Sequence, residues 1–291
     1  MEEEILKIEN LTKLYGDVVG VKDLSLSLNK GEIFGFIGPN GAGKSTTIRA
    51  IMNLINKNSG KVFVCGKEFD KNDIDIKSIV GYLPSEINLY EDLTVKQILD
   101  YHEMFYKKDI HSRRVQLVEK LDLDETKRIE NLSLGNRKKL GIILAFMHEP
   151  KLLILDEPTS GLDPMMQQVL YDLLKEEKSK GTTILYSTHI LSEISKICDR
   201  VGIIKNGSLL KVESIDDIRS KNLTFVTIES KDNDNMVKNL KIDVIEKNEK
   251  YIKFKNIQSS DELIKNLANY KIDKILIEEA SLDDLFLHYY E

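Results

Sequence analysis

The feature that most constrains the fold is a glycine-rich loop at residues 38–45, with the sequence GPNGAGKS. It follows a short apolar run at residues 33–37 and precedes a stretch, residues 45–55, that is compatible with a helix. Glycines let the backbone curl so that successive N–H groups face one anion, and the helix adds the positive end of its dipole. Strand, loop and helix in this order predict a phosphate-binding loop in an α/β fold.

Each position of this loop has a predicted role toward a nucleoside triphosphate. We expect Lys44 to reach the β and γ phosphates and Ser45 to hold Mg²⁺. The alternative is a glycine-rich surface turn, but four fixed positions should arise by chance in only about one such chain in a hundred. The residues predicted to bind the nucleotide here are Gly38, Pro39, Asn40, Gly41, Ala42, Gly43, Lys44, Ser45 and Thr46.

A second feature is an apolar run at residues 151–155 that ends in two carboxylates, Asp156 and Glu157. An unbroken apolar run is typical of a strand buried on both faces, and ligands of open α/β sheets bind at the C-terminal ends of the strands. We therefore expect Asp156 to coordinate Mg²⁺, directly or through water, and Glu157 to act as general base on the attacking water. Without the upstream loop, a solvated strand end would be the better interpretation.

Two further clusters accompany these motifs. Ser133 and Gly135 stand at the start of a helical stretch, residues 137–148, where hydroxyl, N–H groups and helix dipole make a second anion site. An ordinary helix N-cap is the alternative. His189 follows a strand predicted at residues 182–187, where it is either structural or in contact with the γ-phosphate.

In order and spacing, these motifs resemble the nucleotide-binding subunit of ATP-binding cassette (ABC) transporters, from residue 6 to about residue 213. GPNGAGKS is similar to the Walker A motif, LSLGN to the signature motif, LLILDE to Walker B, SGLD to the D-loop and His189 to the switch histidine. Tyr15 is similar to the aromatic residue that stacks on adenine. The resemblance implies ATP and Mg²⁺ as ligands, with Glu157, His189 and Lys44 as the catalytic residues.

The resemblance also implies a fold and a domain organisation. We expect an α/β P-loop NTPase cassette at residues 1–214, with a mixed sheet core and a helical subdomain at about residues 85–148. In this family, the groove between the helical subdomain and the core receives a short helix of the membrane subunit. Ile87, Leu89 and Tyr90 are the predicted groove residues, and their acidic neighbours favour a partly basic docking helix.

The sequence departs from the family pattern at two places. The usual Gln that contacts Mg²⁺ is replaced by Ser85, followed by Glu86. Either the Ser85 hydroxyl replaces that Gln, or Glu86 swings in, which would be repulsive near the γ-phosphate unless the metal screened it. In the signature motif, Leu134 replaces the usual Gly and Asn136 replaces the usual Gln. Ser133 and Gly135 are therefore the residues of this motif that we expect to bind the nucleotide.

One cassette per chain implies a dimer. In the family, the signature motif is too far from the Walker A loop of its own chain, so Ser133 and Gly135 of a second chain complete each ATP site. Whether the second ATPase subunit is identical stays open, so both a homodimer and a heterodimer are retained.

Past residue 214 the pattern changes to an order βαββαβ. Strands are predicted at residues 223–229, 242–246, 251–255 and 272–278, and helices at residues 235–240 and 259–270. This order predicts a small ferredoxin-like α+β domain at residues 215–291. An amphipathic helix at residues 281–290 resembles the C-terminal extension of ATPases of ABC-2 type exporters, which favours export. Two interpretations of this C-terminal domain stay open: a regulatory or dimer-stabilising role, or a passive cap on the fold.

Composition limits the location and the partners. No apolar run approaches the ~18 residues needed to span a bilayer, and the acidic start lacks the pattern of a signal peptide. We expect a cytoplasmic protein, peripheral on the inner face of the cell membrane, that works with a separate integral membrane permease. The net charge of −6 argues against a nucleic-acid-binding surface. The alternative function is that of a soluble ABC ATPase in translation or DNA repair.

Overall fold

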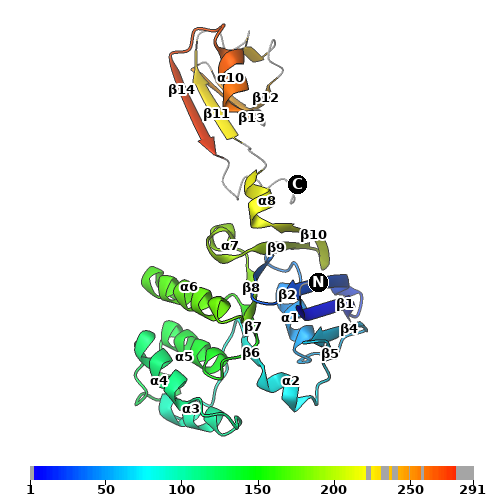
Figure 1. The fold of residues 1–291 in the computed structure, drawn as a ribbon, viewed down its shortest axis with the longest axis vertical. Coiled ribbons are helices and arrows are strands. Elements are labelled where there is room, and N and C mark those ends of the chain that lie inside the picture. Colours follow the sequence, from blue (N-terminus) through cyan, green and yellow to red (C-terminus); the bar gives the residue numbers. More distant parts are fainter. Residues whose placement is uncertain are drawn as a thin grey trace. The chain divides into compact units, whose positions relative to one another are not determined.

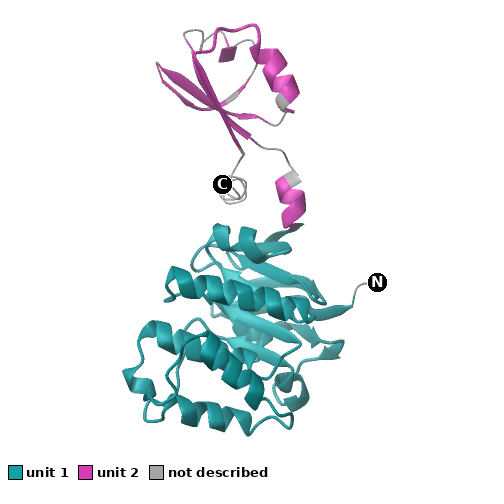
Figure 2. Cartoon of the chain, turned by 60° about the vertical axis from the view of Figure 1, so that its left-hand side comes forward, with its two compact units in different colours: residues 1–213 teal, residues 214–291 magenta. Residues whose placement is uncertain are grey.

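The computed structural model describes residues 3–220, 224–230, 236–237, 242–248, 250–256 and 259–279. The chain divides into two compact units, residues 1–213 and residues 214–291 (Figure 2). Sheets of four and six strands belong to the larger unit, and a further four-stranded sheet belongs to the smaller one. Within the described residues, every helix is too short or too polar to cross a bilayer.

The six-stranded sheet brings the predicted motifs to one edge. Its strands lie in the order β10 (Ser208–Ser214), β9 (Arg200–Lys205), β3 (Ile33–Ile37), β8 (Thr183–Thr188), β7 (Leu152–Asp156) and β6 (Val80–Leu83) (Figure 1). The strands from β9 to β6 are parallel. Ile37 pairs with Thr188, and Asp156 pairs with Ser187. The predicted strands at residues 33–37, 151–155 and 182–187 are thus confirmed, and their carboxyl ends share one edge.

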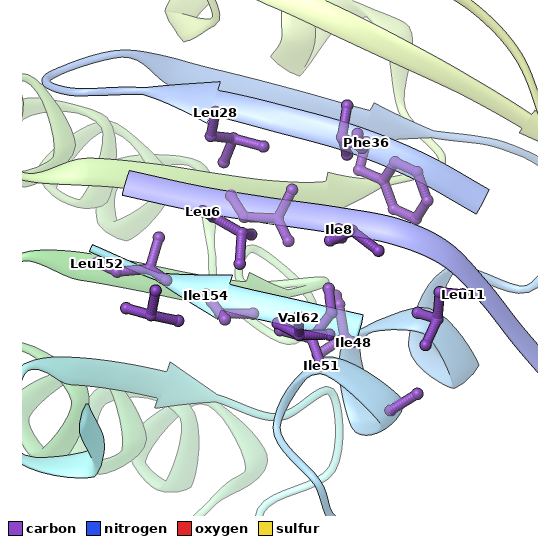
Figure 3. Packing of buried hydrophobic residues seen from close by; sticks show 14 of the residues in the cluster. Leu6, Ile8, Leu11, Leu28, Phe36, Ile48, Ile51, Val62, Leu152 and Ile154 are labelled. Atoms are coloured by element: carbon purple, nitrogen blue, oxygen red, sulfur yellow. The ribbon is translucent and has the colours of Figure 1, made fainter. Parts of the chain in front are cut away.

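The second sheet of the larger unit is antiparallel and consists of β2 (Val18–Asn29), β1 (Glu4–Tyr15), β4 (Ser59–Val64) and β5 (Lys67–Glu68). The main apolar core lies between the two sheets and includes α1 (Lys44–Ile51), which contacts β1, β2 and β7. Leu6 and Ile8 from β1, Ile48 from α1 and Ile154 from β7 meet in this core (Figure 3). Burial of these side chains anchors α1, and with it the glycine-rich loop that precedes it.

The predicted helix at residues 45–55 ends earlier, at Ile51. Asn53 takes a left-handed conformation with φ 54°, and the N–H of Leu54 donates to the Arg49 carbonyl at 2.9 Å. The N–H of Asn53 donates to the Ala50 carbonyl at 3.2 Å. These two bonds form a Schellman motif, in which asparagine replaces the usual glycine. The sequence prediction overlooked this helix stop.

The chain segment that connects β6 to β7 contains three helices, which lie together beside β6 (Figure 1): α3 (Val95–Glu103), α4 (His111–Lys120) and α5 (Leu134–Phe146). α5 contacts β6, and both α3 and α4 contact α5. Thr94 and Gln97 form a capping box at the start of α3. Ser133 caps α5, so this helix begins three residues before the predicted start at residue 137. The remaining helices of the unit are α2 (Ile74–Ser78), the short 3₁₀ helix at Ile129–Asn131, α6 (Pro164–Ser179) and α7 (Leu191–Ile197).

The smaller unit contains α8 (Ile215–Ser220), β11 (Thr224–Glu229), β12 (Asp243–Lys247), β13 (Tyr251–Asn256), α10 (Ser260–Leu267) and β14 (Lys274–Glu279). Its antiparallel sheet has the order β12-β13-β11-β14. β11 and β12 therefore run parallel with β13 between them, which is the arrangement of a split βαβ unit. Of the predicted helix at residues 235–240, only residues 236–237 are described, and the one at residues 281–290 lies outside the described residues.

Candidate functional site

A cavity of about 590 Å³ opens at the carboxyl edge of the parallel strands. Its walls come from the start of α1, from the turn between β1 and β2, and from the segments that follow β6, β7 and β8. Most predicted site residues line it: Tyr15, Asn40, Gly41, Gly43, Lys44, Ser45, Thr46, Ser85, Glu157 and His189. The other lining residues are Val18, Val19, Gly20, Glu86 and Ser160. Residues up to 174 positions apart in sequence, such as Tyr15 and His189, thus share one cavity.

The glycine-rich loop has a backbone that only glycine adopts easily. Gly43 precedes α1 with φ 106°, and a Cβ there would lie 2.4 Å from the Gly20 carbonyl oxygen. A Cβ on Gly38 would lie equally close, 2.4 Å, to the Ile204 carbonyl oxygen. Any side chain at these positions would displace backbone. The loop can therefore approach a ligand with its N–H groups uncovered.

Glu157 lies between two cationic or potentially cationic groups. Its Oε1 is 3.6 Å from Lys44 Nζ, and its Oε2 is 2.9 Å from His189 Nδ1. The Lys44 ammonium, which is 6% exposed, also donates to the carbonyls of Gly38 at 2.7 Å and Pro39 at 3.2 Å. Burial of an ammonium requires such partners. The arrangement places a carboxylate, an ammonium and an imidazole on one wall of the cavity.

The backbone of Glu157 directs this side chain. Glu157 has φ 49°, a left-handed conformation that is uncommon for a residue other than glycine. Its N–H donates to the Ser187 carbonyl at 3.0 Å. The strain is small, of order 1 kcal/mol, and such strain often occurs at functional sites.

Asp156 has the properties of a metal ligand. It is fully buried, and its Oδ1 accepts a hydrogen bond of 3.1 Å from the Ser187 hydroxyl. Its Oδ2 has no hydrogen-bond partner among the described residues. A buried carboxylate oxygen without a partner is costly unless a cation or water satisfies it. Carboxylate and hydroxyl oxygens are the ligands that Mg²⁺ prefers, so Asp156 and the cavity-lining Ser45 fit this ion.

Tyr15 stands at the rim of the cavity with 48% of its surface exposed. The Lys13 ammonium lies 4.8 Å from its ring centroid. A half-exposed aromatic ring beside a phosphate-binding loop can stack on a nucleobase. Gly20 packs against the same ring, since a Cβ there would lie 2.9 Å from Tyr15 Cε2.

Ser133 and Gly135 are not among the residues described as lining this cavity. Ser133 caps α5, accepting a hydrogen bond of 3.3 Å from the Asn136 N–H. A Cβ on Gly135 would lie 3.0 Å from the Gly161 carbonyl oxygen, so the signature segment packs against the D-loop segment. Gly135 thus lies against the segment that contains Gly161, and neither Ser133 nor Gly135 belongs to the described wall of the cavity.

Two buried charged residues near the site, Lys138 and Glu193, were not predicted from the sequence. Lys138 on α5 is 2% exposed and donates to the carbonyls of Ser85 and Glu157, each at 3.1 Å. Glu193 on α7 accepts hydrogen bonds from the hydroxyls of Tyr186, Thr188 and Thr159. A signal existed for Lys138: it precedes Gly141 and Ile142 by three and four positions, on the buried face of α5.

A lysine-bearing glycine-rich loop between a buried strand and a helix, with an acidic pair at the end of a parallel strand, defines a P-loop nucleoside triphosphatase. The family model described as "ABC transporter" matches residues 21–160. Among solved structures, one titled "Structure of ATP binding subunit of ABC transporter" is 32% identical with a TM-score of 0.70, covering 74% of this chain and 92% of that one.

Curated relatives give the same result. The linearmycin resistance ATP-binding protein LnrL of Bacillus subtilis is 37% identical over 75% of this chain and 71% of its own length. The bacitracin transport ATP-binding protein BcrA of Bacillus licheniformis is 37% identical over 80% of this chain and 77% of its own. An uncharacterized ABC transporter ATP-binding protein of Methanocaldococcus jannaschii is 35% identical over 94% of this chain and 98% of its own length. The chain belongs to the family of ABC transporter ATP-binding proteins, and it is an ATPase. The predicted fold class is confirmed.

Proposed function

We propose that this ATPase powers export of a substrate across the cytoplasmic membrane through a separate membrane-spanning permease. The observation that carries the catalytic part is the position of the Glu157 carboxylate, 3.6 Å from Lys44 Nζ and 2.9 Å from His189 Nδ1. The names of the relatives, which concern linearmycin resistance and bacitracin transport, support the export part.

Within the cavity, the chain's residues divide the work of hydrolysis. The glycine-rich loop and Lys44 bind the phosphates, while Tyr15 stacks on adenine. Glu157 accepts a proton from the attacking water, and His189 orients Glu157 or contacts the γ-phosphate. Ser45 and Asp156 would hold Mg²⁺, with Ser85 as a further hydroxyl on the cavity wall. Mg²⁺, when bound, neutralises charge that develops on the phosphate oxygens.

We further propose that two chains close around ATP. Ser133 is exposed and is not part of the described wall of this cavity, and its hydroxyl, which accepts from the Asn136 N–H, can still donate to the nucleotide of a second subunit. A two-fold dimer would then hold two equivalent sites. Closure on ATP and opening after hydrolysis would supply the mechanical step, since a ligand shifts an equilibrium only by binding one state better.

An apolar cavity of about 420 Å³ is the proposed docking groove for the permease. Leu89 and Tyr90, two of the predicted groove residues, line it together with Ile98, Tyr101, His102, Phe105, Leu144 and Asn88. The third predicted residue, Ile87, is not among the described lining residues. It packs on α5 instead, where a Cβ on Gly141 would lie 2.4 Å from Ile87 Cδ1. Of the three predicted residues, Leu89 and Tyr90 are therefore kept in the proposed groove, and the part of Ile87 stays a prediction.

The catalytic proposal is tested with Glu157→Gln. Gln keeps the size of the side chain but cannot accept the proton, so turnover should fall at least a hundredfold while ATP binding is retained. ATP should then trap the dimer, which light scattering detects. Near wild-type ATPase activity of Glu157→Gln would refute the role of Glu157.

The dimer proposal is tested in the Glu157→Gln background. Ser133→Asp keeps the helix cap but adds a negative charge toward the phosphates, so it should abolish the ATP-dependent dimer. Ser133→Thr should keep the dimer.

The transport proposal is tested by co-purification. The tagged Glu157→Gln chain is isolated from gently solubilised membranes of its host, with and without ATP. Recovery with a polytopic membrane protein supports the permease and the peripheral location at the inner face of the membrane. Recovery only from the soluble fraction, with ribosomes or nucleic acid, would favour the alternative function and leave the ATPase chemistry intact.

A further inference from the structure

Lys138 is a buried ammonium that the catalytic proposal does not use. It lies on α5, five positions after the capping residue Ser133, and only 2% of its surface is exposed. An ammonium in the interior is costly unless hydrogen bonds satisfy it. Lys138 Nζ donates to the carbonyl oxygens of Ser85 and Glu157, each at 3.1 Å. The side chain thus links α5 to two segments that line the nucleotide cavity.

Both carbonyls belong to peptides with a part in the site. Glu157 has the left-handed φ of 49°, and its carbonyl also accepts a hydrogen bond of 3.2 Å from the Ser160 N–H. Because the backbone of Glu157 sets where its carboxylate points, a bond that holds this peptide also holds the carboxylate. Ser85 is the first residue past Pro84 after β6, at the position where the family usually has Gln.

Burial and two nearby carboxylates act on the Lys138 ammonium in opposite directions, and burial has the larger effect. Burial lowers the pKa of Lys138, and the carboxylates of Asp156 and Glu157 oppose that shift. The ammonium thus bonds to the carbonyl oxygens of Ser85 and Glu157 and is influenced by the acidic end of β7.

We propose that Lys138 is a positioning residue for ATP hydrolysis. Through its ammonium, α5 holds the peptides of Ser85 and Glu157 so that the Glu157 carboxylate faces the attacking water. Ser133 caps the same helix, so a shift of α5 on contact with a second subunit would reach Glu157 through the Lys138 side chain. The inference rests on the role proposed above for Glu157.

The test compares three variants in the full-length chain. Lys138→Met keeps the length of the side chain but removes both hydrogen bonds, so kcat should fall about tenfold to a hundredfold. The KM for ATP should stay within about twofold to threefold, because the glycine-rich loop and Tyr15 do not depend on this contact. Lys138→Arg retains donors for two carbonyls and should recover part of kcat. Lys139→Met is the matched control, since Lys139 on the same helix contacts the Asp122 carbonyl at 3.5 Å, and its kcat should stay near wild type.

The outcomes separate this inference from the catalytic proposal. Wild-type kcat in Lys138→Met, with Glu157→Gln inactive, would overturn only the role of Lys138. High activity of Glu157→Gln would overturn the base assignment on which that role rests. A parallel loss of kcat and of ATP affinity in Lys138→Met, without recovery in Lys138→Arg, would mean a purely structural contact and would also overturn the inference. Urea unfolding of each variant shows that it is folded under the assay conditions.

Discussion

His148 makes the stability of the larger unit depend on pH, and the effect can be calculated. The ring is 6% exposed and stacks on Tyr106 at a centroid distance of 4.6 Å. Its Nε2 lies 3.3 Å from the Val80 carbonyl oxygen. Burial, helped by the nearby His102, lowers the pKa of His148 from 6.5 to about 4. The folded state thus resists protonation over a range of pH in which the unfolded chain accepts a proton.

The sign follows from proton binding. Between about pH 6.5 and pH 4 the unfolded state binds more protons at this position, so the free energy of unfolding falls as the pH falls. With these two pKa values, the loss at about pH 5 relative to about pH 7 is roughly 2 kcal/mol. That is a large fraction of the stability of an ordinary domain.

The assay is urea unfolding followed by far-ultraviolet circular dichroism, for the wild type and for His148→Phe. Phe keeps an aromatic ring against Tyr106 but does not titrate. Other groups that titrate in this range remain in both proteins, so the difference between the two pH dependences isolates His148. The wild type should lose roughly 2 kcal/mol more than the variant between about pH 7 and pH 5. Equal losses in the two proteins would refute the reasoning.

Three further predictions concern binding and packing. Lys44→Ala should weaken ATP binding at least about tenfold, measured by calorimetry, because it removes a charge-assisted contact to phosphate; unchanged affinity would contradict the phosphate-loop assignment. Tyr15→Ala should weaken binding of ATP about tenfold but leave that of inorganic triphosphate unchanged, as loss of base stacking requires. Gly81→Ala should lower the free energy of unfolding by about 2 kcal/mol or more, because its Cβ would lie 2.1 Å from the Ala145 carbonyl oxygen. Gly66→Ala, in open space with φ 77°, should cost only about 1 kcal/mol, and an equal cost for both would refute the steric argument.

The sequence by itself was sufficient for the elements whose signals are local. The apolar runs that form β3 and β7, the glycine-rich loop and the Asp156-Glu157 pair each lie within a few consecutive residues. Their spacing also carried the resemblance to the ABC family, which the comparisons confirm. Helix ends were less well predicted, since α1 ends at Ile51, before the left-handed Asn53, and α5 begins at Leu134, capped by Ser133. A hydrogen bond at the end of a helix leaves a weaker pattern in the sequence than the apolar face of the helix does.

The tertiary structure decided which side chains meet. The parallel strands lie in the order β3-β8-β7-β6, which sequence order alone would not predict, since it would not place β8 between β3 and β7. This order brings the Walker A loop, His189, Glu157 and Ser85 to one edge of the sheet. It also decided that Lys138 is buried against two backbone carbonyls and that Ile87 packs on α5. Local residue patterns specify strands and loops because they act through neighbouring φ and ψ angles and burial of one face. Convergence of distant residues depends on strand order and on which face of each helix is buried, and these are properties of the whole packed chain.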